Sequence, residues 1–256
     1  MKRTGFSLLE LMVVIATIAI LASLLLPALS PAKNRPSQIV DLSNLRQIIL
    51  GLNAYTGDND GTLTWPNWDY GRAMPDGTAR PGWLYTLDLS ATGTNAFNGQ
   101  AGLLWNYLRG GNVFLCPLDQ PDHRYPKKDG SVVQRAQQLS TYIMNGAVIG
   151  FRSGYYSNRP PVKISQMLPG DCLVFEADER DDFCYNDGSS WPSEGISTRH
   201  FQGATQGAGD GSSSYVRDAD WLNEVNCTNR NRLWCYPNSR NGGDPVNGHV
   251  LFNWHF

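Results

Sequence analysis

The chain has 256 residues, a formal net charge of −2 and 17% charged residues, with no cluster of Lys and Arg. This balance lacks the basic footprint of a nucleic-acid-binding protein, so we expect no nucleic-acid partner. The content of 26 Gly, 15 Pro, 8 Trp and 11 Tyr is typical of a β-rich, loop-heavy domain in which aromatic rings anchor short strands. It argues against a helical bundle.

The N-terminal region joins a short basic segment to a long apolar one. Lys2 and Arg3 precede the run 6–29, whose one charged residue is Glu10. As an α-helix this run would extend about 36 Å, enough to cross the about 30 Å hydrocarbon core of a bilayer. It also exceeds the roughly 7–15 apolar residues of a cleaved signal peptide. The sequence therefore predicts a single-pass transmembrane helix over 6–29, with a cytoplasmic N-terminus.

Glu10 has two possible explanations. A carboxylate near the bilayer edge reaches the headgroups at small cost, whereas one near the centre costs about 2.5–3.5 kcal/mol and is usually paired. The second explanation needs a nearby cation. A new α-amino group, formed by cleavage just before Phe6, is a candidate.

The motif "GFSLLE" resembles the processing site of type IV prepilins and type II secretion pseudopilins. The resemblance implies that residues 1–5 are a leader, that prepilin peptidase cleaves after Gly5, and that Phe6 is then N-methylated. It assigns Glu10 to pairing with the amine of a neighbouring subunit during assembly. The implied partners are copies of this chain or related pilin subunits, the peptidase, and the inner-membrane assembly machinery. The implied location is the inner (cytoplasmic) membrane, with the C-terminal domain periplasmic or extracellular, either in the membrane-bound subunit or in a filament.

Prolines follow the apolar run, and we expect a kink over 30–36. The helix is expected to resume at Ser37, which can cap it, and to end near residue 55. Apolar residues recur there at helical spacing, at Ile39, Leu42, Leu45, Ile49 and Leu52. An amphipathic helix of this kind needs a partner surface, and an antiparallel sheet is the expected one.

The rest of the chain alternates turns with short apolar runs. Strands are expected over 112–116, 141–146, 172–178 and 249–256, a short helix over 102–109, and a polar excursion over 221–247. The predicted fold is therefore α+β and pilin-like. It has a transmembrane helix, a Pro-rich kink, and a globular extracytoplasmic domain over 37–256 that includes the helix 37–55.

The segment "RHFQGATQGAGDG" resembles the C-terminal His-x9-Asp-Gly signature of a large prepilin-like family, with His200, Asp210 and Gly211 in register. The chain departs from that family after Gly211, where "SSSYV" follows. His200 and Asp210 could be read as a base and its orienting acid, but no nucleophile stands in a recognisable context beside them. We interpret them as structural residues that fix a hairpin or bridge two strands, and we expect no enzymatic activity.

Other residues leave alternatives open. Cys227 and Cys235 could form a disulfide in an oxidising compartment. The acids of 176–182, with Asp187, could hold a structural calcium ion or form a solvated acidic loop; no other cofactor or metal is expected.

Tryptophans stand beside prolines and acids in expected loops. Trp65, Trp68 and Trp191 could stack on sugars or pack beneath the loops. The sequence therefore predicts a structural subunit of a pilus or secretion pseudopilus, assembled through its N-terminal helix. The alternative is a membrane-anchored or filament-borne surface protein that binds glycans through exposed aromatic loops.

Overall fold

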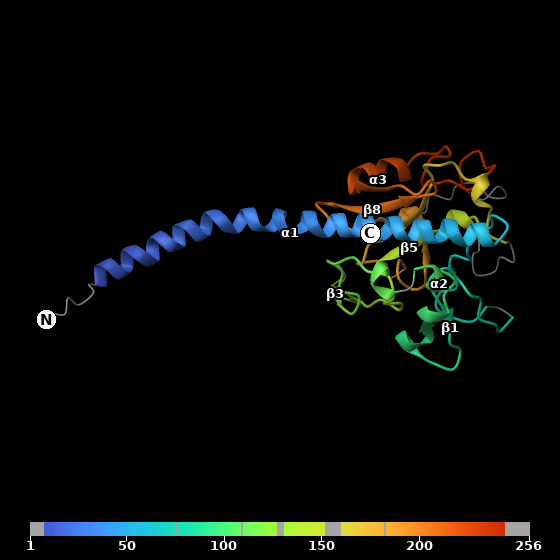
Figure 1. The fold of residues 1–256 in the computed structure, drawn as a ribbon, viewed down its shortest axis with the longest axis horizontal. Helices are drawn as coiled ribbons and strands as arrows, with labels where there is room; N and C mark the ends of the chain where they lie inside the picture. Colours follow the sequence, from blue (N-terminus) through green and yellow to red (C-terminus); the bar gives the residue numbers. More distant parts are fainter. Residues whose placement is uncertain are drawn as a thin grey trace.

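A long helix projects from a domain built around one mixed sheet (Figure 1). The structure, a computed structural model, describes residues 8–74, 76–108, 110–126, 131–151, 160–181 and 183–243, and side chains within these ranges except those of 24–34 and 111. Helix α1 (Leu8–Asp58) is continuous over 51 residues. It continues through 30–36, where the prolines predict a kink, and Figure 1 shows it curving along its length.

The expected transmembrane helix over 6–29 is wrong. Among the described residues, no helix combines the length and apolar character that crossing a membrane requires. The leader prediction, with Gly5 and Phe6, falls on residues outside the described ranges.

The main sheet has five strands in the order β7-β5-β6-β8-β9. Strand β5 pairs with β6 antiparallel and with β7 parallel, and the remaining pairs are antiparallel. A register shift interrupts the β6–β8 pairing between Cys172 and Val174. The strands are β5 (Tyr142–Asn145), β6 (Cys172–Glu176), β7 (Ser189–Ser190), β8 (Gly203–Ala208) and β9 (Ser213–Arg217).

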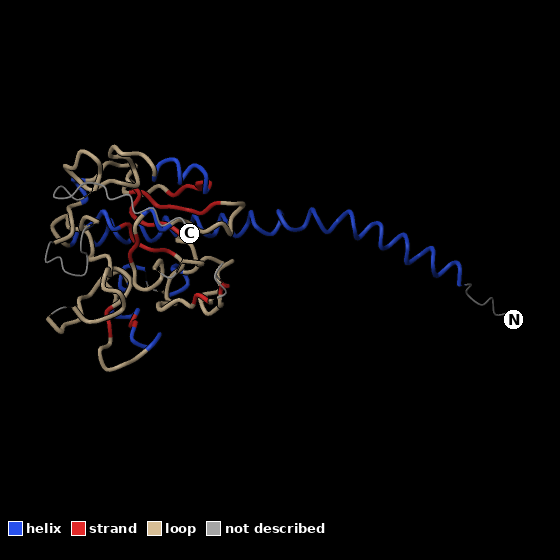
Figure 2. The backbone as a smooth tube through the Cα atoms, turned by 180° about the vertical axis from the view of Figure 1, so that it is seen from behind, coloured by secondary structure: helices blue, strands red, loops and turns tan. Residues whose placement is uncertain are grey.

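Helix α1 crosses one face of this sheet, and Figure 2 shows its domain half running alongside the strands. Leu45, Ile49 and Leu52 are fully buried there, as predicted, whereas Ile39 is 67% exposed. The close approach depends on Gly207 of β8, where a Cβ atom would lie 2.6 Å from Cγ1 of Ile49. The helix and sheet therefore meet through a position that tolerates no side chain.

Short elements cover the rest of the core. The expected strands over 141–146 and 172–178 are confirmed as β5 and β6, but 112–116 forms no strand and begins instead with a 3-10 helix, η3. The expected strand 249–256 lies outside the described residues. The other helices and strands are α2 (Trp105–Leu108), α3 (Asp218–Val225), β1 (Thr86–Leu87), β2 (Phe97–Asn98), β3 (Tyr125–Pro126) and β4 (Val132–Val133). The 3-10 helices are η1 (Gly93–Ala96), η2 (Gly99–Ala101), η3 (Gly111–Phe114), η4 (Gly146–Val148), η6 (Ile164–Gln166) and η7 (Pro192–Glu194).

Candidate functional site

The projecting part of α1 exposes apolar side chains on every side. All described residues from 8 to 23 are exposed, and Leu8 and Leu9 reach 75% and 73%. We call residues 8–23 the stalk. A helix that is apolar all round is normally covered by other structure, because exposed apolar surface is costly in water. Glu10, the predicted assembly residue, lies on the stalk and is exposed.

The part of α1 that packs on the sheet, its domain half, carries a buried acid. Asp41 is fully buried and faces His200, which directly precedes the turn into β8. Cys116, which follows η3, and Glu176, at the end of β6, complete a buried group of four. We call these four residues the His200 cluster.

The His200 cluster is compact. One potential ligand atom from each of the four side chains lies within 4.8 Å of every other. His200 Nε2 is 3.3 Å from Cys116 Sγ, 3.5 Å from Asp41 Oδ2 and 3.6 Å from Glu176 Oε1. Three acceptor atoms therefore surround one imidazole nitrogen, each beyond the about 2.9 Å typical of an N–H···O hydrogen bond.

Burial and charge act in opposite directions on these groups when only protons are bound. Burial would lower the pKa of His200, but hydrogen bonds with Asp41, Cys116 and Glu176 raise it to about 12. Burial raises the pKa of Cys116 to about 11, and burial together with the charge of Asp41 raises the pKa of Glu176. Burial also opposes ionisation of Asp41, but hydrogen bonds from His200, Thr205 and Tyr142 leave its pKa lowered. A cation in this group is therefore strongly favoured.

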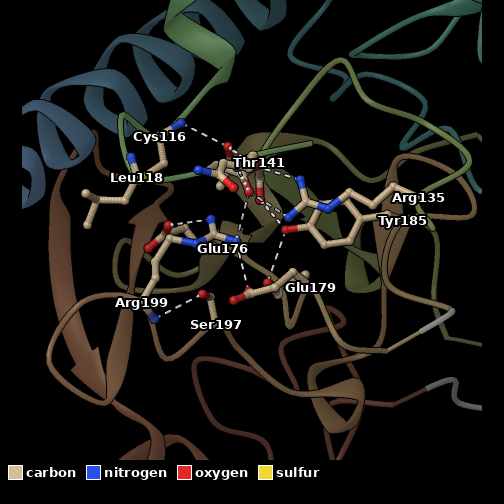
Figure 3. Close-up of polar contacts among 12 residues, drawn as sticks. Cys116, Leu118, Arg135, Thr141, Glu176, Glu179, Tyr185, Ser197 and Arg199 are labelled. Carbon is tan, nitrogen blue, oxygen red and sulfur yellow. Dashed lines mark hydrogen bonds and ion pairs between the residues drawn. The ribbon is translucent and has the colours of Figure 1, made fainter. Parts of the chain in front are cut away.

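Two arginines extend the network (Figure 3). Arg199 contacts Glu176 at 3.2 Å, Glu179 at 2.8 Å and Asp119 at 3.2 Å. Arg135 forms a bidentate pair with Asp119 at 2.6 and 2.8 Å. Its guanidinium also lies 3.8 Å from the centre of the Tyr185 ring, and Figure 3 shows the two side chains together.

A tight turn holds His200 in place. The backbone N–H of Gly203 donates to the carbonyl of His200 at 3.0 Å, and the reverse bond is 3.2 Å. Phe201 and Gln202, the two central residues, have φ values of 49° and 63°. Non-glycine residues in this left-handed region are strained and persist where the surroundings enforce them.

The signature residues separate into two places. Asp210 and Gly211 form the turn between β8 and β9, where the Asp210 carboxylate accepts from the Ser212 N–H at 2.9 Å and Gly211 has a φ of 90°. Strand β8 separates this turn from His200. His200 and Asp210 therefore do not meet, so the base-and-acid pairing lacks the necessary contact. The hairpin turn itself is formed as the structural interpretation predicts.

The predicted Cys227–Cys235 disulfide is wrong. All five cysteines are free; Cys227 is exposed and Cys235 is buried. The Cys227 thiol, just beyond the end of α3, donates to the Asn223 carbonyl at 3.4 Å. Cys235 lies inside the core, 3.8 Å from the Asn145 side-chain nitrogen. Packing therefore holds the two sulfurs in different environments.

The acids proposed for calcium have other partners. Glu176 and Glu179 contact Arg199, and Asp178 pairs with Arg180 at 2.9 Å. Asp187 is buried elsewhere, where it accepts from the backbone N–H groups of Tyr70 and Ser189. These contacts account for Glu176, Asp178, Glu179 and Asp187 without a metal ion, and calcium binding stays a prediction without support from this geometry.

The tryptophans proposed for sugar stacking pack inward. Trp65 and Trp68 are each 4% exposed. Trp191 is half-buried and stacks on Phe151 with ring centres 5.0 Å apart. The packing alternative therefore describes these rings, and they offer no exposed aromatic face for a glycan.

The sequence singled out His200, and Glu176 as a calcium candidate, but it did not connect either of them with Asp41 and Cys116. Asp41 interrupts the apolar spacing of its helix, and Cys116 and Glu176 stand more than 50 residues apart, so no local motif connects them. Compared with known proteins, the chain matches no family model, no curated protein and no solved structure. The geometry of the stalk and of the His200 cluster is therefore the basis for the proposals that follow.

Proposed function

We propose that the protein is a filament-forming structural subunit that assembles through its stalk with further copies of this chain or closely related subunits. The observation that carries the proposal is the exposure of every described side chain of the stalk, Leu8 through Ser23, on a helix whose other half is anchored in a folded domain. A bundle of such helices gives each of them an apolar partner on every face.

The energetics favour packing between stalks. Ile18, Ile20 and Leu21 are 59–61% exposed, and their burial would stabilise an assembly by roughly 25 cal/mol for each Å² of apolar surface removed from water. A bundle of identical helices supplies apolar partners on all sides, whereas a single groove would cover only one face. Multiple copies therefore fit the stalk better than one docking protein.

The resemblance of "GFSLLE" to prepilin sites adds a chemical element to this proposal. Cleavage after Gly5 by a prepilin peptidase would place an N-methylated Phe6 amine four residues from Glu10. In a dry bundle, the Glu10 carboxylate of one copy would pair with the amine of the next, because an ionised group there needs a counter-charge. This contact would set the axial register between subunits, and an assembly machinery would add them one at a time.

The test uses the full chain produced together with a prepilin peptidase. Mass spectrometry is expected to find a mature chain that begins at methylated Phe6, and Gly5→Ala is expected to leave the chain uncleaved. A wild-type chain that still carries Met1 would overturn the processing step.

Assembly is tested separately by a matched pair on α1. Leu21 on the stalk and Leu50 on the domain half are 61% and 53% exposed. Leu21→Asp is expected to reduce ordered filaments, counted by electron microscopy, at least tenfold, while Leu50→Asp leaves them unchanged. Equal assembly of the two variants, or a wild-type chain that forms no ordered multimer, would contradict the proposal. Glu10→Gln is expected to lower incorporation into wild-type filaments while leaving the domain folded.

A further inference from the structure

The His200 cluster differs from an ordinary buried ion pair in its composition and spacing. It combines an imidazole, a thiol and two carboxylates, which are the side chains that bind zinc in proteins. Zinc binds these donors at about 2.0–2.3 Å, so neighbouring ligand atoms around a tetrahedral ion lie about 3.3–3.7 Å apart. The three distances from His200 Nε2, 3.3, 3.5 and 3.6 Å, all fall in that range.

We propose that Asp41, Cys116, Glu176 and His200 form a closed, four-coordinate site for a divalent cation of the zinc type. The inference goes beyond the assembly function and is independent of it. Sulfur and nitrogen donors disfavour calcium and magnesium, which prefer oxygen ligands, and favour zinc among the common divalent ions. All four residues are at most 2% exposed, so the site has no open position for a substrate and its role is structural.

The surroundings hold the ligands as an outer shell would. The Tyr142 hydroxyl donates to Oδ1 of Asp41, and the Thr205 hydroxyl donates to Oδ2, the oxygen that faces His200. The Thr205 backbone N–H donates to Oε2 of Glu176 at 2.8 Å, and Oε1 faces both His200 and Arg199. The Leu118 N–H lies 3.4 Å from the Cys116 sulfur, a contact that stabilises a thiolate.

The ion would tie together four segments that are far apart in sequence: α1, the segment after η3, β6, and the turn before β8. Because each contributes one ligand, the site would close long loops of the unfolded chain. A metal of this kind stabilises the folded state directly.

The experiment uses the purified full chain. After exposure to Zn²⁺ and removal of loosely bound ions, elemental analysis is expected to find one zinc per chain. With Co²⁺ instead, we expect the intense visible bands of a four-coordinate ion and a thiolate-to-cobalt charge-transfer band in the near ultraviolet.

Variants assign the site. Cys116→Ser is expected to abolish the charge-transfer band and lower zinc affinity at least about 100-fold, whereas Cys235→Ser, which alters a buried thiol outside the cluster, keeps both. Glu176→Gln keeps the shape of the side chain and is expected to weaken binding while the circular dichroism of the fold persists. If a variant does not fold, the wild-type protein decides: a chelator is expected to lower its Tm. No zinc retained by the folded wild-type chain, or a charge-transfer band that survives Cys116→Ser, would overturn the proposal.

Discussion

The two halves of α1 are both rich in Leu and Ile, yet they meet opposite surroundings. The stalk exposes its apolar residues on all sides, while the domain half buries Leu45, Ile48 and Ile49 completely and adds the buried acid Asp41. Hydrophobicity alone therefore does not tell where a helix of this chain is covered within the subunit. The buried charge marks the half that folds against its own sheet, because Asp41 is stable only where the chain supplies its partners.

The largest loss of stability is expected from removing the buried arginine that pairs with the acids beside the His200 cluster. Arg199→Met would leave Asp119, Glu176 and Glu179 without their shared cation, at a cost of about 3–5 kcal/mol in the free energy of unfolding. Denaturant unfolding measures this cost. Arg180→Met removes a half-exposed pair with Asp178 and is expected to cost about 0–1 kcal/mol. Equal losses in the two variants would show that the buried network has no special weight.

The apolar contrast is tested by two truncations on the same helix. Leu45→Ala opens a cavity between α1 and the sheet and is expected to cost about 2–5 kcal/mol. Leu21→Ala on the stalk is expected to change the unfolding of the domain by less than about 0.5 kcal/mol. A large loss from Leu21→Ala would mean that the stalk stabilises its own domain and is not reserved for a partner.

The pH dependence of stability provides a further test, because Asp69 is a second buried acid. Burial raises the pKa of Asp69 to about 6, and no arginine among the described residues offsets it, in contrast to Glu176. Because the ionised form is disfavoured in the folded state, Asp69 lowers stability as pH rises from about 4 through 6, by about 1–3 kcal/mol. Asp69→Asn keeps Oδ1, which accepts from Gly71 and Tyr85, and is expected to remove that decline.

The control for Asp69→Asn is an exposed acid. Hydrogen bonds from Ser90 lower the pKa of Asp88, so Asp88 stabilises the fold above its unfolded pKa and loses that contribution as pH falls. Asp88→Asn is therefore expected to leave the slope of stability against pH unchanged in unfolding curves measured between pH 4 and 7, because the contribution of Asp88 is lost only below about pH 4. A pH profile unchanged by Asp69→Asn would contradict the expectation for the buried acid.

The smallest effect concerns the contact between α1 and β8. Gly207→Ala would place a Cβ atom 2.6 Å from Ile49 and is expected to cost about 1–3 kcal/mol through overpacking. Gly57, which lies on α1, has open space where its Cβ would lie. Gly57→Ala is therefore expected to stabilise the domain by about 0.4–1 kcal/mol. Thermal unfolding of both variants would separate a packing requirement from a conformational one. Stabilisation by both would refute the close helix–sheet contact.

The sequence predicted those elements of the fold that depend on residues close together in the chain. The runs that became β5 and β6 are apolar and bounded by turn residues, and Asp210-Gly211 is a turn pair, so these elements were accessible from sequence. Leu45 and Ile49 follow helical spacing for the same reason. Which face of α1 is buried was harder to predict, because Asp41 and Asn44 occupy buried positions where helical spacing leads one to expect apolar residues.

The long-range features could not be predicted this way. The His200 cluster depends on residues brought together from four segments, and their identities are ordinary in their local contexts. The failed Cys227–Cys235 prediction has the same origin, since spacing along the chain does not report which sulfur is buried. The membrane-spanning prediction rested on the length and apolar composition of 6–29, and no helix among the described residues meets both requirements.

The unbroken backbone of α1 links the two proposals through angle as well as position. Each residue of an α-helix turns the chain by about 100° and advances it by about 1.5 Å. Inserting one residue between the stalk and Asp41 would therefore rotate the whole domain by about 100° around the axis of the helix. Inserting seven residues would rotate it by about 700°, close to two full turns, and would nearly restore its original orientation. The number of residues between the stalk and the sheet therefore determines how each domain is oriented on the surface of an assembled filament.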